Sequence, residues 1–209
     1  MSVSYGRLNI ELMQLLDGLD HLGMSDAVDE TILEKQEFLA RKLLQEGVPP
    51  HLMKLIFHES YLYQGNPNDS EIMNFLGQDM GSDVANTYAK MLIDFYVIES
   101  RLRFDRKPML DSYGTIPSTV VNQSHTVRDL IYTSMYFRDF ENINRKNYPK
   151  LMDEFTHKTF KSHAYEAMSL NGVIAKSILY CLKLNNYRII QKGRMLGLDV
   201  DEVVRNYGN

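Results

Sequence analysis

Apolar residues recur at steps of three and four through most of the chain, and the alternation of apolar and polar residues that marks a strand is nearly absent. Side chains three and four apart share one face of an α-helix, so this periodicity predicts amphipathic helices and no sheet. The hydrophobic share of 44% and the charged share of 24% are ordinary for a globular protein and unlike those of a disordered chain. We therefore predict an all-α bundle of about eight to nine helices.

Turn and cap residues set the expected boundaries of these helices. In the first half we expect helices that start near Leu8, Val28, Pro50, Ser70 and Ser82, with Gly47 as a C-terminal stop. In the second half we expect one from Ser124 through Phe140, one from Pro149 to about Leu170, two over 172–185 and 187–196, and a short one after Asp199.

The stretch 105–123 contains Pro108, Gly114 and Pro117 and lacks a helical period. Loops of this length are uncommon inside compact domains, so it is either a functional loop or a linker. It separates an expected helical part over 1–104 from a second over 124–209, and we expect the two to form one compact unit.

The two halves of the sequence also differ in charge. Residues 1–100 contain 6 basic and 16 acidic residues, whereas residues 101–209 contain 17 and 11. This polarity is consistent with a basic face for nucleic acid, with a head-to-tail contact between copies, or with an internal contact between the two halves.

The sequence contains few signs of catalytic or metal chemistry. Glu154 and His157 have the E-x-x-H spacing of di-iron bundles, and His163 and Glu166 are expected on the same helix, but the second E-x-x-H step that such sites use is absent. The only cysteine, Cys181, lies in an apolar run and is expected in the core. We therefore predict a protein that is not an enzyme and that needs no metal or other cofactor.

Residues 36–59 read as a helix, a break at Gly47 and a second helix, which is the opening of a helix-turn-helix module, with 70–79 as a possible third helix. The stretch from Leu39 to Gly47, L-A-R-K-L-L-Q-E-G, resembles an N-terminal helix of the FlhC-type master activators of flagellar and conjugation genes. A second stretch, from Ile131 to Tyr136 and followed by Phe140, is similar to a helix that comes after the proline-containing loop of that family.

The resemblance implies an all-helical DNA-binding activator. FlhC-type proteins bind zinc through four C-terminal cysteines, whereas this chain has Cys181 alone, so their zinc site does not carry over. From residue 36 to residue 80 there are three basic residues against six acidic ones, which disfavours the hairpin as the surface that contacts phosphates.

Basic residues gather in two other places. One group leads into the irregular stretch, and the other lies between 167 and 198, where no acidic residue occurs. Phosphate contacts need such cations, and Tyr187 could stack on a base. The predicted nucleic-acid-binding residues are Arg101, Arg103, Arg106, Lys107, Lys183, Arg188, Lys192 and Arg194.

The sequence thus favours a helical DNA-binding transcriptional regulator that binds duplex DNA and acts as a homo-oligomer or with a protein partner. The alternative is a structural or adaptor protein, such as a scaffold or viral assembly factor, that works through protein–protein contacts. The first residues lack the pattern of a signal peptide and no apolar run is long enough to span a membrane, so we expect a cytoplasmic protein with no membrane partner.

Overall fold

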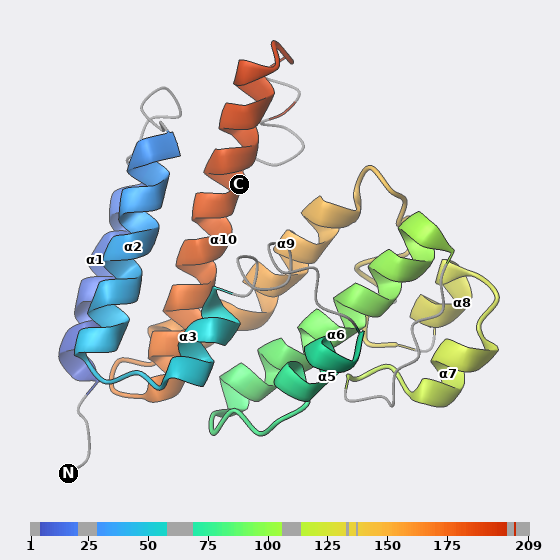
Figure 1. Ribbon diagram of the computed structural model, residues 1–209, viewed down its shortest axis with the longest axis horizontal. Coiled ribbons are helices and arrows are strands. Elements are labelled where there is room, and N and C mark those ends of the chain that lie inside the picture. The colour runs from blue at the N-terminus through green and yellow to red at the C-terminus, as the bar shows by residue number, and fades with distance from the viewer. Residues whose placement is uncertain are drawn as a thin grey trace. The chain divides into compact units, whose positions relative to one another are not determined.

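The computed structural model describes residues 5–20, 29–57, 69–105, 114–132, 134–136, 138–199 and 203, and every regular element within these ranges is helical. The predicted all-α class is confirmed. None of the described helices is both long and apolar enough to cross a membrane. The helices, labelled in Figure 1 apart from the 3₁₀ helix η1, are α1 (Gly6–Asp20), α2 (Asp29–Gln45), α3 (Pro50–Ile56), α5 (Asp69–Leu76), α6 (Asp83–Phe104), α7 (Ser118–Gln123), α8 (Val127–Tyr132), α9 (Tyr148–Phe160), η1 (His163–Tyr165) and α10 (Leu170–Met195).

Contacts divide the chain into two compact units. Unit 1 comprises Met1–Ile56 and Thr156–Asn209, and unit 2 comprises Phe57–Phe155, so that one boundary falls inside α9. This division does not follow the expected split into 1–104 and 124–209. Each unit contains residues from both the acidic and the basic half of the sequence.

In unit 1, α10 packs against α1, α2, α3 and η1, and Figure 1 shows α1, α2 and α10 side by side. The Tyr187 hydroxyl donates to the backbone oxygen of Leu19 at 2.7 Å. Lys42, in the last turn of α2, lies 2.8 Å from Glu11 near the start of α1, so α2 is antiparallel to α1. The core between these helices is formed mainly by buried leucines, Leu8, Leu12, Leu19, Leu39 and Leu43.

In unit 2, α6 is the central helix and contacts α5 and α8. It begins where expected, because the Ser82 hydroxyl accepts from the Ala85 backbone N–H and caps the helix. An aromatic cluster packs on its middle turns, in which the Tyr136 and Phe155 ring centroids lie 4.9 Å apart. The other rings of the cluster are those of Phe95 and Phe140.

The second half of the chain departs from the predicted boundaries in three places. Part of the stretch expected to be irregular, from 118 to 123, is helix α7. The helix expected to reach Phe140 ends at Tyr132, and Phe140 is instead buried in a series of turns. The helix expected to reach Leu170 ends at Phe160. Phe140 packs against the Phe95 ring of α6 from these turns, so tertiary packing overrides the local helical pattern there.

The two helices expected over 172–185 and 187–196 are one continuous helix, α10. Asn185 and Asn186 lie at the expected break, and asparagine is a weak helix former. Leu184, Asn186 and Ile190 are all buried, so tertiary packing holds the helix through this point. The helix ends with a Gly197 at φ +69°, as Gly47 at φ +73° ends α2.

Candidate functional surfaces and buried polar sites

The basic residues of α10 do not form one face. Lys183 and Arg194 are eleven residues apart and share a side of the helix, whereas Arg188 lies roughly 140° around from Lys183 at about 100° per residue. Lys192 is one turn beyond Arg188 and is exposed. The four predicted phosphate contacts on this helix therefore point in two directions.

Three side chains of this stretch turn towards α1 and α2. The Arg188 guanidinium donates to the Gln36 side-chain oxygen at 3.2 Å. Partial burial lowers the pKa of Lys183, which the nearby Asp17 carboxylate opposes. Tyr187, considered as a stacking residue, donates to α1 instead. All three join the two halves of the sequence, which is consistent with the internal contact that was one of the three interpretations of the charge polarity, and one of them, Lys183 with Asp17, joins opposite charges.

The two units have different charge balances, and neither is basic. Over the sequence, unit 1 has thirteen basic and thirteen acidic residues, and unit 2 has ten and fourteen. Attraction to the phosphate backbone supplies most non-specific affinity for nucleic acid. A unit without net positive charge can bind DNA only through a local cluster of cations.

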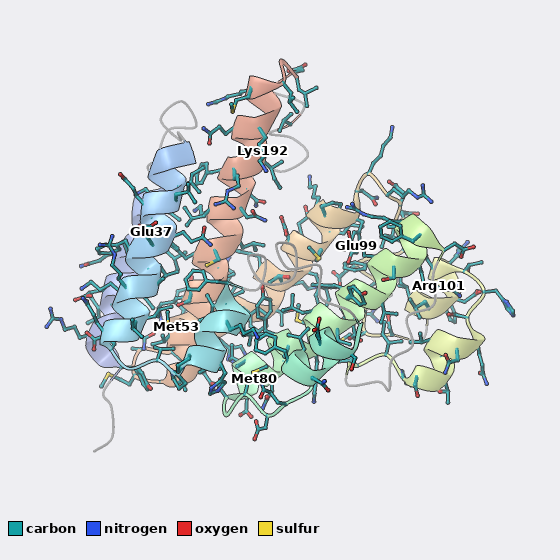
Figure 2. The ribbon with its side chains drawn as sticks, in the orientation of Figure 1. Glu37, Met53, Met80, Glu99, Arg101 and Lys192 are labelled. Carbon is teal, nitrogen blue, oxygen red and sulfur yellow. The ribbon has the colours of Figure 1, made fainter. Side chains whose placement is uncertain are left out.

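Arg101 is a structural residue in unit 2. Its side chain is only 5% exposed, and one Nη donates to the backbone oxygen of Ser124. The other Nη lies 3.5 Å from an Asp105 carboxylate oxygen. Arg101, labelled in Figure 2, thus connects the turn before α8 to the last turns of α6. Because its side chain is buried, it is not available to contact a phosphate as predicted.

A smaller cationic group remains exposed at the C-terminal end of α6. Arg103 forms an ion pair with Glu99 at 2.9 Å. Arg145 donates to the Leu102 backbone oxygen at 2.8 Å, which places it beside the same helix end. The exposed neighbours in sequence are Phe104 and Lys146, while the predicted Arg106 and Lys107 lie outside the described residues.

The possible metal ligands are not on one helix. Glu154 and His157 lie on α9, which ends at Phe160, whereas His163 begins η1 and Glu166 follows it. His163 Nδ1 lies 2.7 Å from a Glu166 carboxylate oxygen, so these two side chains bind each other. Within the described ranges, no group of three or more His, Cys, Asp or Glu side chains is placed to hold a metal ion.

Unit 1 buries an ammonium group that sequence patterns did not single out. Lys176 is 3% exposed, and its Nζ donates to Asn9 Oδ1 at 2.7 Å and to the Glu166 backbone oxygen at 3.3 Å. Asn9 also donates to the Ser169 backbone oxygen at 3.2 Å. The network joins α1, α10 and the segment before α10. Burial lowers the pKa of Lys176, and the Glu166 carboxylate opposes this.

Unit 2 buries a carboxyl group in the same manner. Asp94 is 1% exposed in the middle of α6 and accepts from the backbone N–H of Thr115 at 3.0 Å and of Ile116 at 3.1 Å. The Thr115 hydroxyl and the Tyr136 hydroxyl, the latter at 2.8 Å, also donate to it. Burial raises the pKa of Asp94 and the hydrogen bonds oppose that rise. A single charged residue within an apolar helical stripe was the only available signal for either site.

Large apolar side chains are exposed mainly on unit 1. Of twelve such side chains among the described residues, nine belong to unit 1 and three to unit 2. Those of unit 2 are Phe104, Tyr132 and Met135. Those of unit 1 are Ile10, Leu33, Phe38, Leu44, Tyr165, Met168, Met195, Leu196 and Leu198.

The hairpin that resembles a helix-turn-helix module forms as α2 and α3, which contact each other in unit 1. Its possible third helix corresponds to α5, which belongs to unit 2. Leu52, Leu55 and Ile56 are buried, so the apolar side of α3 contributes to the core.

Comparison of the chain with protein-family models, with curated proteins and with solved structures gives no match. The FlhC-type resemblance stays a prediction.

Proposed function

We propose that the chain is a non-enzymatic protein-interaction module, an adaptor whose partners bind to unit 1. The observation that carries this proposal is the concentration of exposed large apolar side chains on the unit whose charges balance. Apolar surface in contact with water favours association with another protein, and the absence of net charge removes a general attraction to polyanions.

Contacts that cationic side chains make within unit 1 support the same proposal. Lys42 pairs with Glu11, and Arg188 donates to the neutral side chain of Gln36, so both join helices of unit 1 to each other. Side chains engaged in such contacts hold the helices in place and leave fewer cations for an external polyanion. These cations then contribute to folding, and the exposed apolar residues serve binding.

Affinity purification with cross-linking tests the proposal, using the full chain and nuclease-treated extract. The triple substitution Met195→Ser, Leu196→Ser and Leu198→Ser removes three exposed apolar side chains from unit 1. The matched control is Phe104→Ser, Tyr132→Ser and Met135→Ser in unit 2. Specific partners should be lost with the first variant and kept with the second. Partners lost only with the control variant, or with neither, would contradict the assignment to unit 1.

A second candidate is a DNA-binding transcriptional regulator that acts as an oligomer or with a partner. The exposed Arg103, Phe104, Arg145 and Lys146 at the end of α6 favour it, because cations beside an aromatic ring suit phosphate and base contacts. The test is duplex DNA binding over a salt series. Neutralising Arg103, Arg145 and Lys146 to Gln should flatten the salt dependence by about three contacts if they bind phosphates.

The same series should include Lys183, Arg188, Lys192 and Arg194 changed together to Gln. If these residues serve packing within unit 1, this variant should lose stability more than DNA affinity. Absence of any duplex binding at low salt would remove the second candidate.

A further inference from the structure

The outward side of α2 carries a stripe of four exposed residues, Leu33, Glu37, Arg41 and Leu44, which we name the α2 stripe. Leu33 is 52% exposed and Leu44 is 62% exposed. The buried Ile32, Leu39 and Leu43 of the same helix face the core. Glu37 is labelled near the middle of α2 in Figure 2.

The α2 stripe is close to symmetric about its own centre. Leu33 and Leu44 are eleven residues apart, which is about three helical turns and roughly 16 Å along the axis. Glu37 and Arg41 occupy the turns between them. Rotation by two-fold symmetry about the middle of the stripe exchanges the two leucines and brings the acidic position level with the basic one.

We propose that a second copy of this chain binds along the α2 stripe, with the two α2 helices antiparallel and related by a two-fold axis. Leu33 packs on the partner's Leu44, and Glu37 faces the partner's Arg41, each pair occurring twice. The inference rests on the proposed function and names one partner for that surface, the chain itself.

Charge selects this occupant and this orientation. In the antiparallel pairing both Glu37 side chains meet an arginine of opposite charge. In a parallel pairing Glu37 would face the partner's Glu37, and Arg41 would face the partner's Arg41, which is destabilising. An unrelated partner helix would need the same apolar ends with the charges reversed, whereas a second copy provides them by symmetry.

The contact is small, because one helix face with two leucines buries less surface than the 1,200–2,000 Å², approximately, of a stable interface. The dimer is therefore weak and reversible. It forms as protein concentration rises.

Sedimentation velocity of the full chain over a concentration series measures this dimer. Leu33→Lys with Leu44→Lys should raise the dimer dissociation constant by about tenfold or more, since each change replaces a leucine buried in the contact with a charged side chain. Ile10→Lys is the matched control, since Ile10 is 61% exposed on α1 outside the α2 stripe. It should leave the dissociation constant unchanged, and circular dichroism should show that all three proteins are folded.

A charge exchange tests the pairing itself. Glu37→Arg alone and Arg41→Glu alone should each weaken the dimer, because each sets like charges against each other twice. The double variant E37R/R41E, and an equimolar mixture of the two single variants, should restore it. Restoration in both cases supports the antiparallel two-fold arrangement.

Two outcomes overturn the inference. One is a monomer at every concentration, and the other is a dimer that the α2 substitutions do not change. Either can occur while Met195, Leu196 and Leu198 still capture partner proteins, in which case the adaptor function stands and only self-association fails. A dimer that responds as described, with no captured partner, would instead confine the function to self-assembly.

Discussion

Asp94 in unit 2 and Lys176 in unit 1 are both buried ionisable side chains, and the two groups are stabilised differently. Asp94 in unit 2 accepts from two backbone N–H groups and two hydroxyls, all of them in the non-helical segments around Thr115 and Tyr136. Lys176 in unit 1 donates to one side-chain oxygen and one backbone oxygen. The carboxylate is thus more fully coordinated than the ammonium group.

The two buried groups differ in what they hold in place. Around Asp94, Thr115 and Ile116 lie outside any helix and their backbone N–H groups donate to the carboxylate, which fixes this segment on α6. Around Lys176, the joined helices α1 and α10 already pack through buried leucines. We therefore expect loss of Asp94 to cost more than loss of Lys176, and the following predictions test that order.

The largest effect is expected at Asp94. Asp94→Leu leaves the buried N–H of Ile116 and the part-buried N–H of Thr115 without their Asp94 acceptor, and we expect the free energy of unfolding to fall by about 3–5 kcal/mol. Asp94→Asn is the matched control, because its side-chain oxygen can still accept, and it should cost less than half as much. Urea denaturation measures both. Equal costs would mean that the charge or the second oxygen of the carboxylate, and not the one acceptor oxygen that asparagine keeps, governs this site.

The next largest change in stability is expected at Gly172, which lies beside the Lys176 network as Gly114 lies beside Asp94. A Cβ on Gly172 would lie 2.0 Å from the Glu166 backbone oxygen, and one on Gly114 would lie 2.2 Å from Asp94 Oδ1. Gly172→Ala should lower stability by about 1–3 kcal/mol through overpacking. Gly18→Ala, where a Cβ meets nothing within 4 Å on α1, should instead raise it by about 0.5–1 kcal/mol. A neutral Gly172→Ala in thermal denaturation would show that the Lys176 network is loosely held.

Lys176→Met should have a smaller effect than Asp94→Leu. The substitution keeps an apolar stem of similar length and removes a buried charge, but it leaves Asn9 Oδ1 without its Lys176 donor. We expect a loss of about 1 kcal/mol in urea denaturation, from one unsatisfied oxygen partly offset by the removed desolvation cost. A loss as large as that of Asp94→Leu would reverse the comparison between the units.

The smallest effects are two pH dependences of opposite sign. The folded pKa of Asp94 lies above its ordinary value of 3.8, so the folded state binds more protons and stability relative to Asp94→Asn falls as pH rises from 3.8 through the folded pKa. The folded pKa of Lys176 lies below its ordinary value of 10.5, so stability relative to Lys176→Met rises with pH from the folded pKa towards 10.5.

The difference in the free energy of unfolding between wild type and variant isolates the contribution of Asp94 or Lys176. This is needed because Glu11, Asp79 and Asp129 have lowered pKa values, so their contribution to stability is lost as pH falls. Free energies of unfolding measured at several pH values in each window check the slopes. Slopes of the same sign in the two windows would contradict the assignment of both groups.

Local signals in the sequence predicted much of the helical framework. The Ser82 cap and the span of α6 are where the sequence placed them, and Gly47 ends α2 as predicted. The bounds that were wrong are those at Tyr132, at Phe160 and within α10. Phe140 explains the first of these, because it joins the aromatic cluster on α6 from a turn and not from a continuing helix.

The fold class and the net charge can be read from the sequence, because helical periodicity and composition are local properties of the chain. Which charged and polar side chains contact each other depends on tertiary packing. Asn9 and Lys176 are 167 residues apart and Asp94 and Tyr136 are 42 apart, and no spacing rule links residues at such separations. Part of the charge polarity that suggested an external partner is internal to unit 1, because α10 packs against α1 and α2 and brings Lys183 near Asp17.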